Sequence, residues 1–264
     1  MMNRVVIEPM GMGRILDISF QLFRQKLKVY LLISLVGNIA NILFYLISGI
    51  LALTYSTEAY ENTQGVVSLI GAIPLGIFYV FMTAALISAT NCFLNQEEVT
   101  VGKAFRLGAG RFWALVGTGL LYILGIFFGL LLFIIPGIFL MVRWFLNPQA
   151  VMMENVAGTK ALGRSKELVK GYWWRSFWFV IVVGIITGVA SGIVVVLSSL
   201  AASVAGNGQV EVVMTNFLTP LVTVIVSPYS VIAATLYYFE LRARKEGWDL
   251  EQSIGRLEGD TKDE

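Results

Sequence analysis

The chain has 264 residues, of which 57% are hydrophobic and 14% are charged, and its mean hydropathy is +0.77. These values lie well outside the range of a soluble globular domain, so the composition predicts an integral membrane protein. The formal net charge is only +2, and the cations lie beside long apolar segments, which favours membrane lipids over nucleic acid as their partners.

The chain opens with a predicted amphipathic helix over residues 13–28. The polar side carries basic residues and one carboxylate, whereas the other side is mostly apolar: Arg14, Asp17, Gln21, Arg24 and Lys28 lie on the first, and Ile15, Leu16, Ser19, Leu22, Phe23 and Leu27 on the second. This pattern is typical of a helix that lies in the membrane interface with its apolar side facing the bilayer. Residues 1–28 are therefore predicted to form an N-terminal cytoplasmic segment with an interfacial helix.

Six predicted membrane spans follow this helix. The third and fourth are separated because the apolar stretch 112–153 would extend about 63 Å as one helix, twice the hydrocarbon thickness. Pro136 and Gly137 form the strongest turn signal inside that stretch, so the turn is predicted there. Prolines predict a kink in the second span, at Pro74, and interruptions in the sixth, at Pro220 and Pro228. The predicted spans are 29–54, 66–93, 112–135, 138–153, 176–204 and 210–240.

The basic residues indicate the orientation of these spans. All but one of the 19 Lys and Arg residues lie in segments 1–28, 94–112, 149–175 and after Leu241, whereas connections 55–65 and 205–211 contain none. Basic loops stay on the cytoplasmic side during insertion. The sequence therefore predicts an all-α, multi-pass protein of the plasma membrane, of bacterial type, with both termini inside. Its membrane domain is 29–240, and 241–264 is a cytoplasmic tail.

Spans 1, 3 and 5 each follow a short basic segment that ends in aromatic residues. One interpretation is an internal repeat of three hairpin units, each with its own cytoplasmic interfacial helix. The other is that any cytoplasmic loop collects basic and aromatic anchors.

Arg143 is the exceptional cation, because it is the only ionisable side chain placed clearly within a predicted span. With the fourth span starting near residue 138, Arg143 lies about 8 Å inside the outer boundary. It either binds a lipid phosphate or another anion, or it acts as a structural clamp on backbone carbonyls or extends to the interface. Asn147, one turn further, is predicted to share its face.

Polar and small residues inside the spans suggest two further features. A polar stripe in the sixth span could line a substrate path, or could satisfy carbonyls that the prolines leave unpaired; its members are Asn216, Thr219, Thr223, Ser227 and Ser230. Asn38 and Asn41 are predicted to join helices.

Glycines four residues apart predict close helix packing within the chain, or a contact with another copy; these are Gly125 and Gly129, and Gly184, Gly188 and Gly192.

The absent residue types restrict catalysis. The chain has no histidine and a single cysteine, Cys92, which excludes Ser-His and Cys-His nucleophilic pairs and metal sites built on histidine or on several thiolates. No carboxylate lies in the middle of a predicted span, so embedded aspartyl dyads and proton relays have no candidate. Glu154 and Glu240 fall at cytoplasmic span ends, where Lys or Arg partners are near. Neither a metal nor a cofactor is predicted.

Three stretches together resemble the membrane domain attached to some bacterial glycerophosphoryl diester phosphodiesterases and found in standalone homologues. They are the opening 13–24; the segment from Ile135-Pro136-Gly137-Ile138 through Arg143-Trp144, Pro148, Glu154, Ala161-Leu162, Arg164-Ser165, Leu168-Val169 and Gly171 to Trp174-Arg175; and the segment 237–250. The third departs from the family's usual form by having Glu240 in place of Asp. The resemblance covers nearly the whole chain. It implies no activity, because the phosphodiesterase reaction belongs to a separate soluble domain.

The sequence thus favours a non-catalytic membrane protein, a lipid-associated scaffold or factor, over an enzyme. Its expected partners are membrane lipids, with anionic headgroups at the cytoplasmic face, and a second copy or another membrane protein. The alternative is a transporter or flippase for an amphiphilic or lipid-like substrate, whose path would run from Arg143 to the polar stripe.

Overall fold

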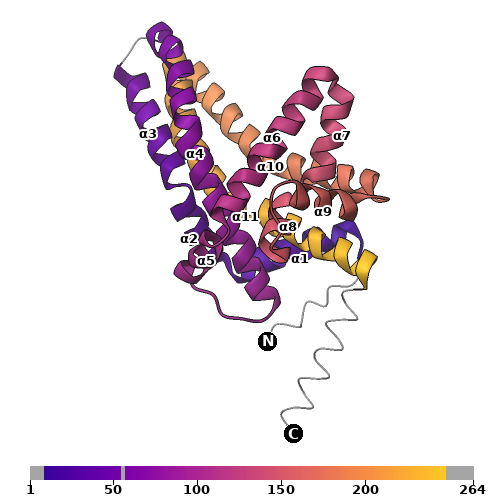
Figure 1. The fold of residues 1–264 in the computed structure, drawn as a ribbon. Helices are drawn as coiled ribbons and strands as arrows, with labels where there is room; N and C mark the ends of the chain where they lie inside the picture. The colour runs from indigo at the N-terminus through magenta and orange to yellow at the C-terminus, as the bar shows by residue number, and fades with distance from the viewer. Residues whose placement is uncertain (1–8, 55–56, 248–264) are drawn as a thin grey trace.

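The computed structural model describes residues 9–54 and 57–247 (Figure 1). Within these ranges all regular structure is α-helical. The helices are α1 (Met12–Gln25), α2 (Leu27–Gly37), α3 (Ile39–Thr54), α4 (Thr57–Leu94), α5 (Val101–Ala109), α6 (Phe112–Leu132), α7 (Ile134–Trp144), α8 (Asn147–Glu154), α9 (Thr159–Val169), α10 (Trp173–Ala205) and α11 (Gly208–Glu246).

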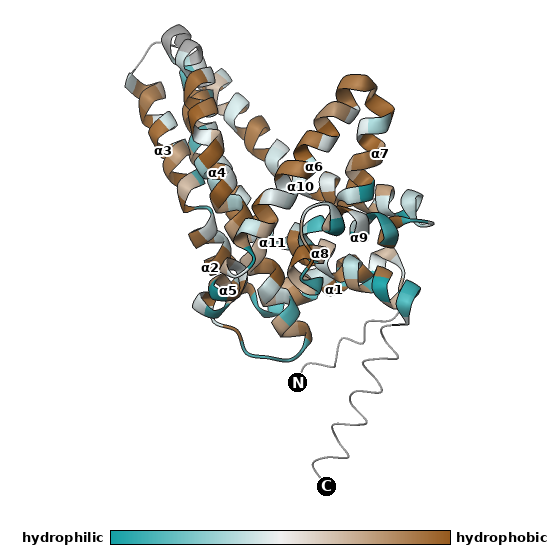
Figure 2. Cartoon of the chain, in the orientation of Figure 1, coloured by the Kyte–Doolittle hydropathy of each residue, from teal (hydrophilic) through white to brown (hydrophobic). Residues whose placement is uncertain are grey.

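Two arms diverge from a layer of short helices (Figure 1). The first arm contains α3, α4 and the parts of α10 and α11 nearest their connection, and the second is the α6–α7 hairpin. We call α1, α5, α8 and α9, which lie together at the opposite end, the basal layer. Figure 2 shows hydrophobic residues along most of both arms, whereas hydrophilic residues gather in the basal layer. This distribution is that of a protein embedded in a membrane through its arms.

Five stretches are long and apolar enough to cross a membrane: 65–94 in α4, α6, the α7–α8 stretch, α10 and α11. The pair α2 and α3 forms a sixth span if it is counted as one bent crossing. The prediction of an all-helical membrane protein is confirmed. Both ends of the described chain lie in or beside the basal layer, since the backbone N–H of Met10 donates to Glu240 near the end of α11.

The first predicted span is not one straight helix. It breaks at Asn38, and the axes of α2 and α3 differ by 58°. Asn38 ends α2, and its side-chain Nδ2 donates to the carbonyl of Ser34 at 2.9 Å. Such a side-chain bond to the backbone competes with the continuing helix. Gly37 also packs tightly on α4, because a Cβ there would lie 2.4 Å from the Cβ of Met82.

The turn between the third and fourth spans is also displaced from its predicted place. The helical pattern breaks at Phe133, which is extended, and Pro136 and Gly137 lie inside the first turn of α7. A proline is tolerated there because the first N–H groups of a helix have no intrahelical acceptor. The fourth predicted span is moreover divided into α7 and α8. Ser165 bonds the chain at this second break, where its Oγ accepts from the N–H of Leu146.

The prolines of the longest helices do not end them. Pro74 lies within α4, and Pro220 and Pro228 lie within α11, which continues as one helix. The predicted interruption of the sixth span is therefore not observed. Membrane helices tolerate proline when neighbouring groups stabilise the locally disturbed backbone, and α11 packs chiefly against α10 and α3.

The core lies where the basal layer meets the adjoining ends of the long helices. Its largest fully buried side chains include Tyr30, Phe179, Tyr237 and Tyr238. By contrast, apolar side chains such as Leu131 and Ile135 near the tip of the second arm are exposed, as expected for groups that face lipid. The short helices α1, α5 and α9 precede α2, α6 and α10, an arrangement that fits the hairpin interpretation.

The predicted orientation can be tested by thiol labelling. Gly208 is the first residue of α11, next to the connection with α10, Thr159 is the first residue of α9 in the basal layer, and both are exposed. In a Cys92→Ser background, cysteines at Ser56 and Gly208 should react with an impermeant reagent in sealed cells, whereas one at Thr159 should react only after permeabilisation. Ser56 lies outside the described residues. Labelling of position 159 in sealed cells would overturn the model of six spans with both termini inside.

Candidate functional site

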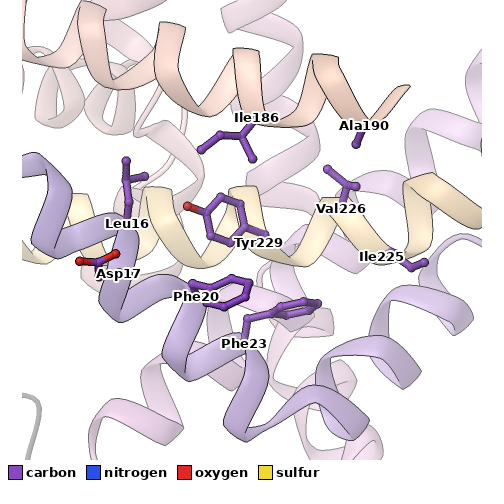
Figure 3. A pocket seen from close by; sticks show the side chains of 9 residues that line it. All are labelled: Leu16, Asp17, Phe20, Phe23, Ile186, Ala190, Ile225, Val226 and Tyr229. Carbon is purple, nitrogen blue, oxygen red and sulfur yellow. The ribbon is translucent and has the colours of Figure 1, made fainter. Parts of the chain in front are cut away.

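One candidate site is a pocket of about 430 Å³ between α1, α10 and α11 (Figure 3). Its size falls in the range of small-molecule sites in proteins. Seven of its nine lining side chains are hydrocarbon only, and the other two belong to Asp17 and Tyr229. The lining is Leu16, Asp17, Phe20 and Phe23 from α1, Ile186 and Ala190 from α10, and Ile225, Val226 and Tyr229 from α11.

The two polar groups of the pocket have no recorded hydrogen bond to another described side chain. Tyr229 projects between α10 and α1, and its hydroxyl points toward the end of the pocket where Leu16 and Asp17 lie (Figure 3). It is close enough to interact electrostatically with the Asp17 carboxylate. Asp17 itself is exposed. An apolar pocket with a few polar groups at one end is suited to an amphiphilic ligand.

Helix α1 is held in place by a narrow buried stripe. Ile15, Ser19 and Leu22 are buried, and the helix packs chiefly against α11. The Ser19 hydroxyl, which would otherwise be an unsatisfied donor, bonds the carbonyl of Ile15 at 2.6 Å. The predicted apolar side of this segment thus faces mainly the protein and not the bilayer. Phe20, which lies outside the predicted apolar side, is 56% exposed and lines the pocket instead.

The outer walls of the pocket continue into surfaces that face lipid. On α10, the neighbours Ile185 and Val189 are exposed, and on α11 Leu221 and Ile225 are exposed. Hydrocarbon chains that cover these helices in a membrane therefore have a continuous apolar route into the pocket.

A buried ion cluster fixes the chain just before α1. Glu240 is fully buried, and its Oε1 accepts from Arg175 Nη2 at 3.0 Å, from Arg244 Nη2 at 2.6 Å and from the backbone N–H of Met10 at 3.3 Å. Arg175 Nη2 also donates to the carbonyl of Met10 at 2.6 Å. We call Met10, Arg175, Glu240 and Arg244 the Glu240 cluster. Because α1 begins two residues after Met10, this cluster positions one wall of the pocket.

A second cluster lies on the other side of the same end of α11. Glu154 accepts from Arg164 Nε at 2.6 Å and from the hydroxyl of Tyr238. Glu246 pairs with Arg164 and, at 3.1 Å, with Arg242. Burial alone would lower the pKa of the Arg164 guanidinium, but its hydrogen bonds with the two carboxylates raise that pKa above the usual value. The arginine partners predicted for Glu154 and Glu240 are thus confirmed, and both clusters consist mostly of residues from the three motif stretches.

Arg143 is not part of either cluster. It lies near the end of α7, with its guanidinium carbon 5.3 Å from the centre of the Phe139 ring. Because α7 begins at Ile134, Arg143 lies about 13 Å along the helix axis from the tip of the hairpin, and its depth below the outer membrane boundary stays a prediction. Asn147 does not continue the same helical face, since α7 ends at Trp144. Asn147 is buried and donates to the carbonyl of Trp144 at 2.9 Å, so it caps α7.

The polar stripe of α11 bonds to α2, to α4 and within α11 itself. Asn216 donates to the Tyr60 hydroxyl at 3.1 Å, and Ser227 shares a 2.9 Å bond with Ser34. The hydroxyls of Thr223 and Ser230 bond the carbonyls of Thr219 and Ser227, at 2.9 Å each. Among the described residues, no recorded side-chain bond goes to the carbonyls four residues before Pro220 or Pro228.

The structure therefore does not bring Arg143 and the stripe together. Arg143 lies in the second arm, whereas Asn216 packs against α3 and α4 in the first. The predicted path between them is not assembled.

The two glycine groups differ in their surroundings. A Cβ at Gly125 would lie 2.4 Å from the Trp144 ring, and one at Gly129 would lie 3.1 Å from the Cα of Gly137, so both allow α6 and α7 to approach closely. At Gly184, Gly188 and Gly192 no heavy atom of another described residue lies within 4 Å of such a Cβ. Their predicted use in packing within the chain is contradicted for the described part of the chain, which leaves this face of α10 uncovered. A contact with another copy stays a prediction.

A smaller pocket of about 270 Å³ lies at the break between α2 and α3, facing α4. Asn38 and Asn41 both line it. Asn38 joins helices as predicted, since its Nδ2 lies 2.9 Å from the Met82 sulfur. Asn41 has no recorded hydrogen bond to a described residue.

Sequence reasoning missed the larger pocket, because its walls come from three segments far apart in the chain. One signal was present: Phe20 is a large apolar residue in a helical position flanked by Asp17, Gln21 and Arg24. Comparison with known proteins found no matching family model, no matching curated protein and no matching solved structure. The resemblance to the phosphodiesterase membrane domain thus stays a prediction.

Proposed function

We propose that this protein is a non-catalytic, lipid-associated membrane factor that holds an acyl chain of a membrane lipid in the pocket between α1, α10 and α11. The observation that carries the proposal is the apolar lining of this pocket together with its open connection to the lipid-facing surfaces of α10 and α11. Each methylene group removed from water contributes about 0.8 kcal/mol, but a chain that moves from the bilayer gains less, so specificity must come from shape and from the polar end.

The proposed setting is the plasma membrane of a bacterium, with the basal layer on the cytoplasmic side. The exposed basic residues of this layer, such as Arg24 in α1 and Arg106 in α5, would then meet anionic headgroups at the membrane surface. In this arrangement α1 separates the pocket from the cytoplasm and acts as a lid on the inner leaflet.

The alternative function, a transporter or flippase for an amphiphilic substrate, is favoured by one observation. The bent crossing formed by α2 and α3 breaks beside a pocket that contains Asn38 and Asn41, and broken helices often surround substrate sites in transporters. However, Arg143 and the stripe of α11 do not support that path, because they lie in different arms.

The lipid-binding proposal can be tested by filling the pocket. Ala190→Trp places an indole among the lining residues and is expected to abolish crosslinking of a phospholipid that carries a photoreactive group in its acyl chain. The matched control is Val189→Trp, because Val189 is exposed on the adjacent face of the same helix and does not line the pocket. The measurement is the mass of crosslinked peptides from α1, α10 and α11 in the purified, folded protein. Equal crosslinking of these peptides in Ala190→Trp and wild type would contradict the proposal.

A further inference from the structure

We propose that the pocket selects a zwitterionic phospholipid through its ammonium headgroup, with Asp17 as the counter-ion. This inference rests on the proposed function, because it names the class of lipid whose chain the pocket holds. It rests on the carboxylate and the aromatic rings that line the pocket.

Asp17 supplies the charge. It is the only ionisable side chain, apart from the Tyr229 phenol, among the nine lining residues. No ion pair joins it to another described residue, whereas Glu154, Glu240 and Glu246 are each paired with arginine. A carboxylate at the rim of an apolar pocket attracts a cation and disfavours the phosphate of a purely anionic headgroup. A hydrogen bond from an ammonium group to a carboxylate is about twice as strong as one between neutral groups.

Aromatic rings are the second feature of the pocket that favours an ammonium group. Phe20, Phe23 and Tyr229 all line the pocket, and Figure 3 shows the rings of Phe20 and Tyr229 facing one space beside Asp17. The structure records no ring contact among these three residues, although Phe23 does contact Tyr30. Aromatic faces attract ammonium groups, and methylated ammonium in particular. The Tyr229 hydroxyl adds an acceptor for an ammonium that carries N–H groups.

The basic residues of α1 do not reverse this preference. Arg14 and Arg24 are exposed and do not line the pocket. They lie three residues before and seven residues after Asp17, on the same polar side of the helix. A zwitterionic lipid satisfies both kinds of group, since its ammonium can face Asp17 while its phosphate faces the arginines.

The experiment is a competition on the purified full chain in detergent, with the photoreactive phospholipid described above as the probe. Unlabelled phosphatidylethanolamine, phosphatidylcholine and phosphatidylglycerol compete for crosslinking within the pocket. In the wild type, at least one of the two zwitterionic lipids should compete about tenfold better than phosphatidylglycerol. A preference for ethanolamine would indicate hydrogen bonding to Asp17, and a preference for choline would indicate binding by the rings; both support the proposal.

Asp17→Asn should retain crosslinking but lose the preference, whereas Asp17→Glu should keep it. Asp17 is exposed, so neither variant should impair folding. The matched control is Glu98→Gln, which removes an exposed carboxylate without a recorded side-chain bond. Equal or better competition by phosphatidylglycerol in the wild type, or an unchanged preference in Asp17→Asn, would overturn the inference. Either result leaves the acyl-chain proposal intact, because that proposal fails only if Ala190→Trp still crosslinks.

Discussion

Glu240→Ala is expected to destabilise the protein by roughly 3 kcal/mol, at the lower end of the cost of removing one partner from a buried ion pair. The carboxylate is fully buried, and its removal takes from two guanidinium groups the carboxylate that they share among the described residues. Since the side chains of Arg175 and Arg244 are 23% and 26% exposed, water can reach them, and the penalty should not exceed this value by much. The backbone N–H of Met10 would lose its acceptor as well.

Thermal unfolding in detergent measures this loss. Glu240→Asp keeps the charge and should destabilise the protein less than Glu240→Ala does. Glu167→Gln is the matched control, because Glu167 is 71% exposed and its contact with Arg164 is 3.8 Å, a type of pair that contributes little. Unfolding of Glu240→Ala at the wild-type temperature would show that the Glu240 cluster does not hold the end of α11 to the chain before α1.

The apolar spans could be predicted from sequence because their length and composition depend on the bilayer and not on neighbouring helices. The breaks within them could not. Asn38 ends α2 by bonding the Ser34 carbonyl, and Gly37 at the same point touches Met82 of α4. The first bond is local, but the contact of Gly37 depends on Met82, which lies 44 residues after Asn38 along the chain. Likewise, Pro136 is a turn signal by itself, but the extended conformation of Phe133 makes it the third residue of α7.

The candidate site, too, could be predicted from the sequence only in part. Periodicity correctly grouped Ile15, Ser19 and Leu22 on one side of α1, but it could not show that α11 covers this side. Residues that looked exceptional within their own helix, such as Arg143 and Asn216, were predicted to share a path, yet they lie in different arms. By contrast, the partners of Glu154 and Glu240 could be predicted, because charges at span ends need counter-ions wherever the chain returns.

Leu22→Glu provides the sharpest test that α1 docks on the protein. Leu22 is 3% exposed, so the change removes a buried side chain and places a carboxylate in its position, at a combined cost of at least about 3 kcal/mol. The expected result is a lower unfolding temperature and reduced accumulation in membranes. Gln21→Glu is the matched control, because it introduces the same group one residue away at an exposed position and should change stability by no more than about 0.5 kcal/mol. If α1 instead lay free at the bilayer surface, Leu22→Glu would weaken its contact with lipid but leave the unfolding temperature of the helical core unchanged. Because α1 forms one wall of the pocket, the docked arrangement also requires that Leu22→Glu reduce acyl-chain crosslinking, even at temperatures where the protein remains folded.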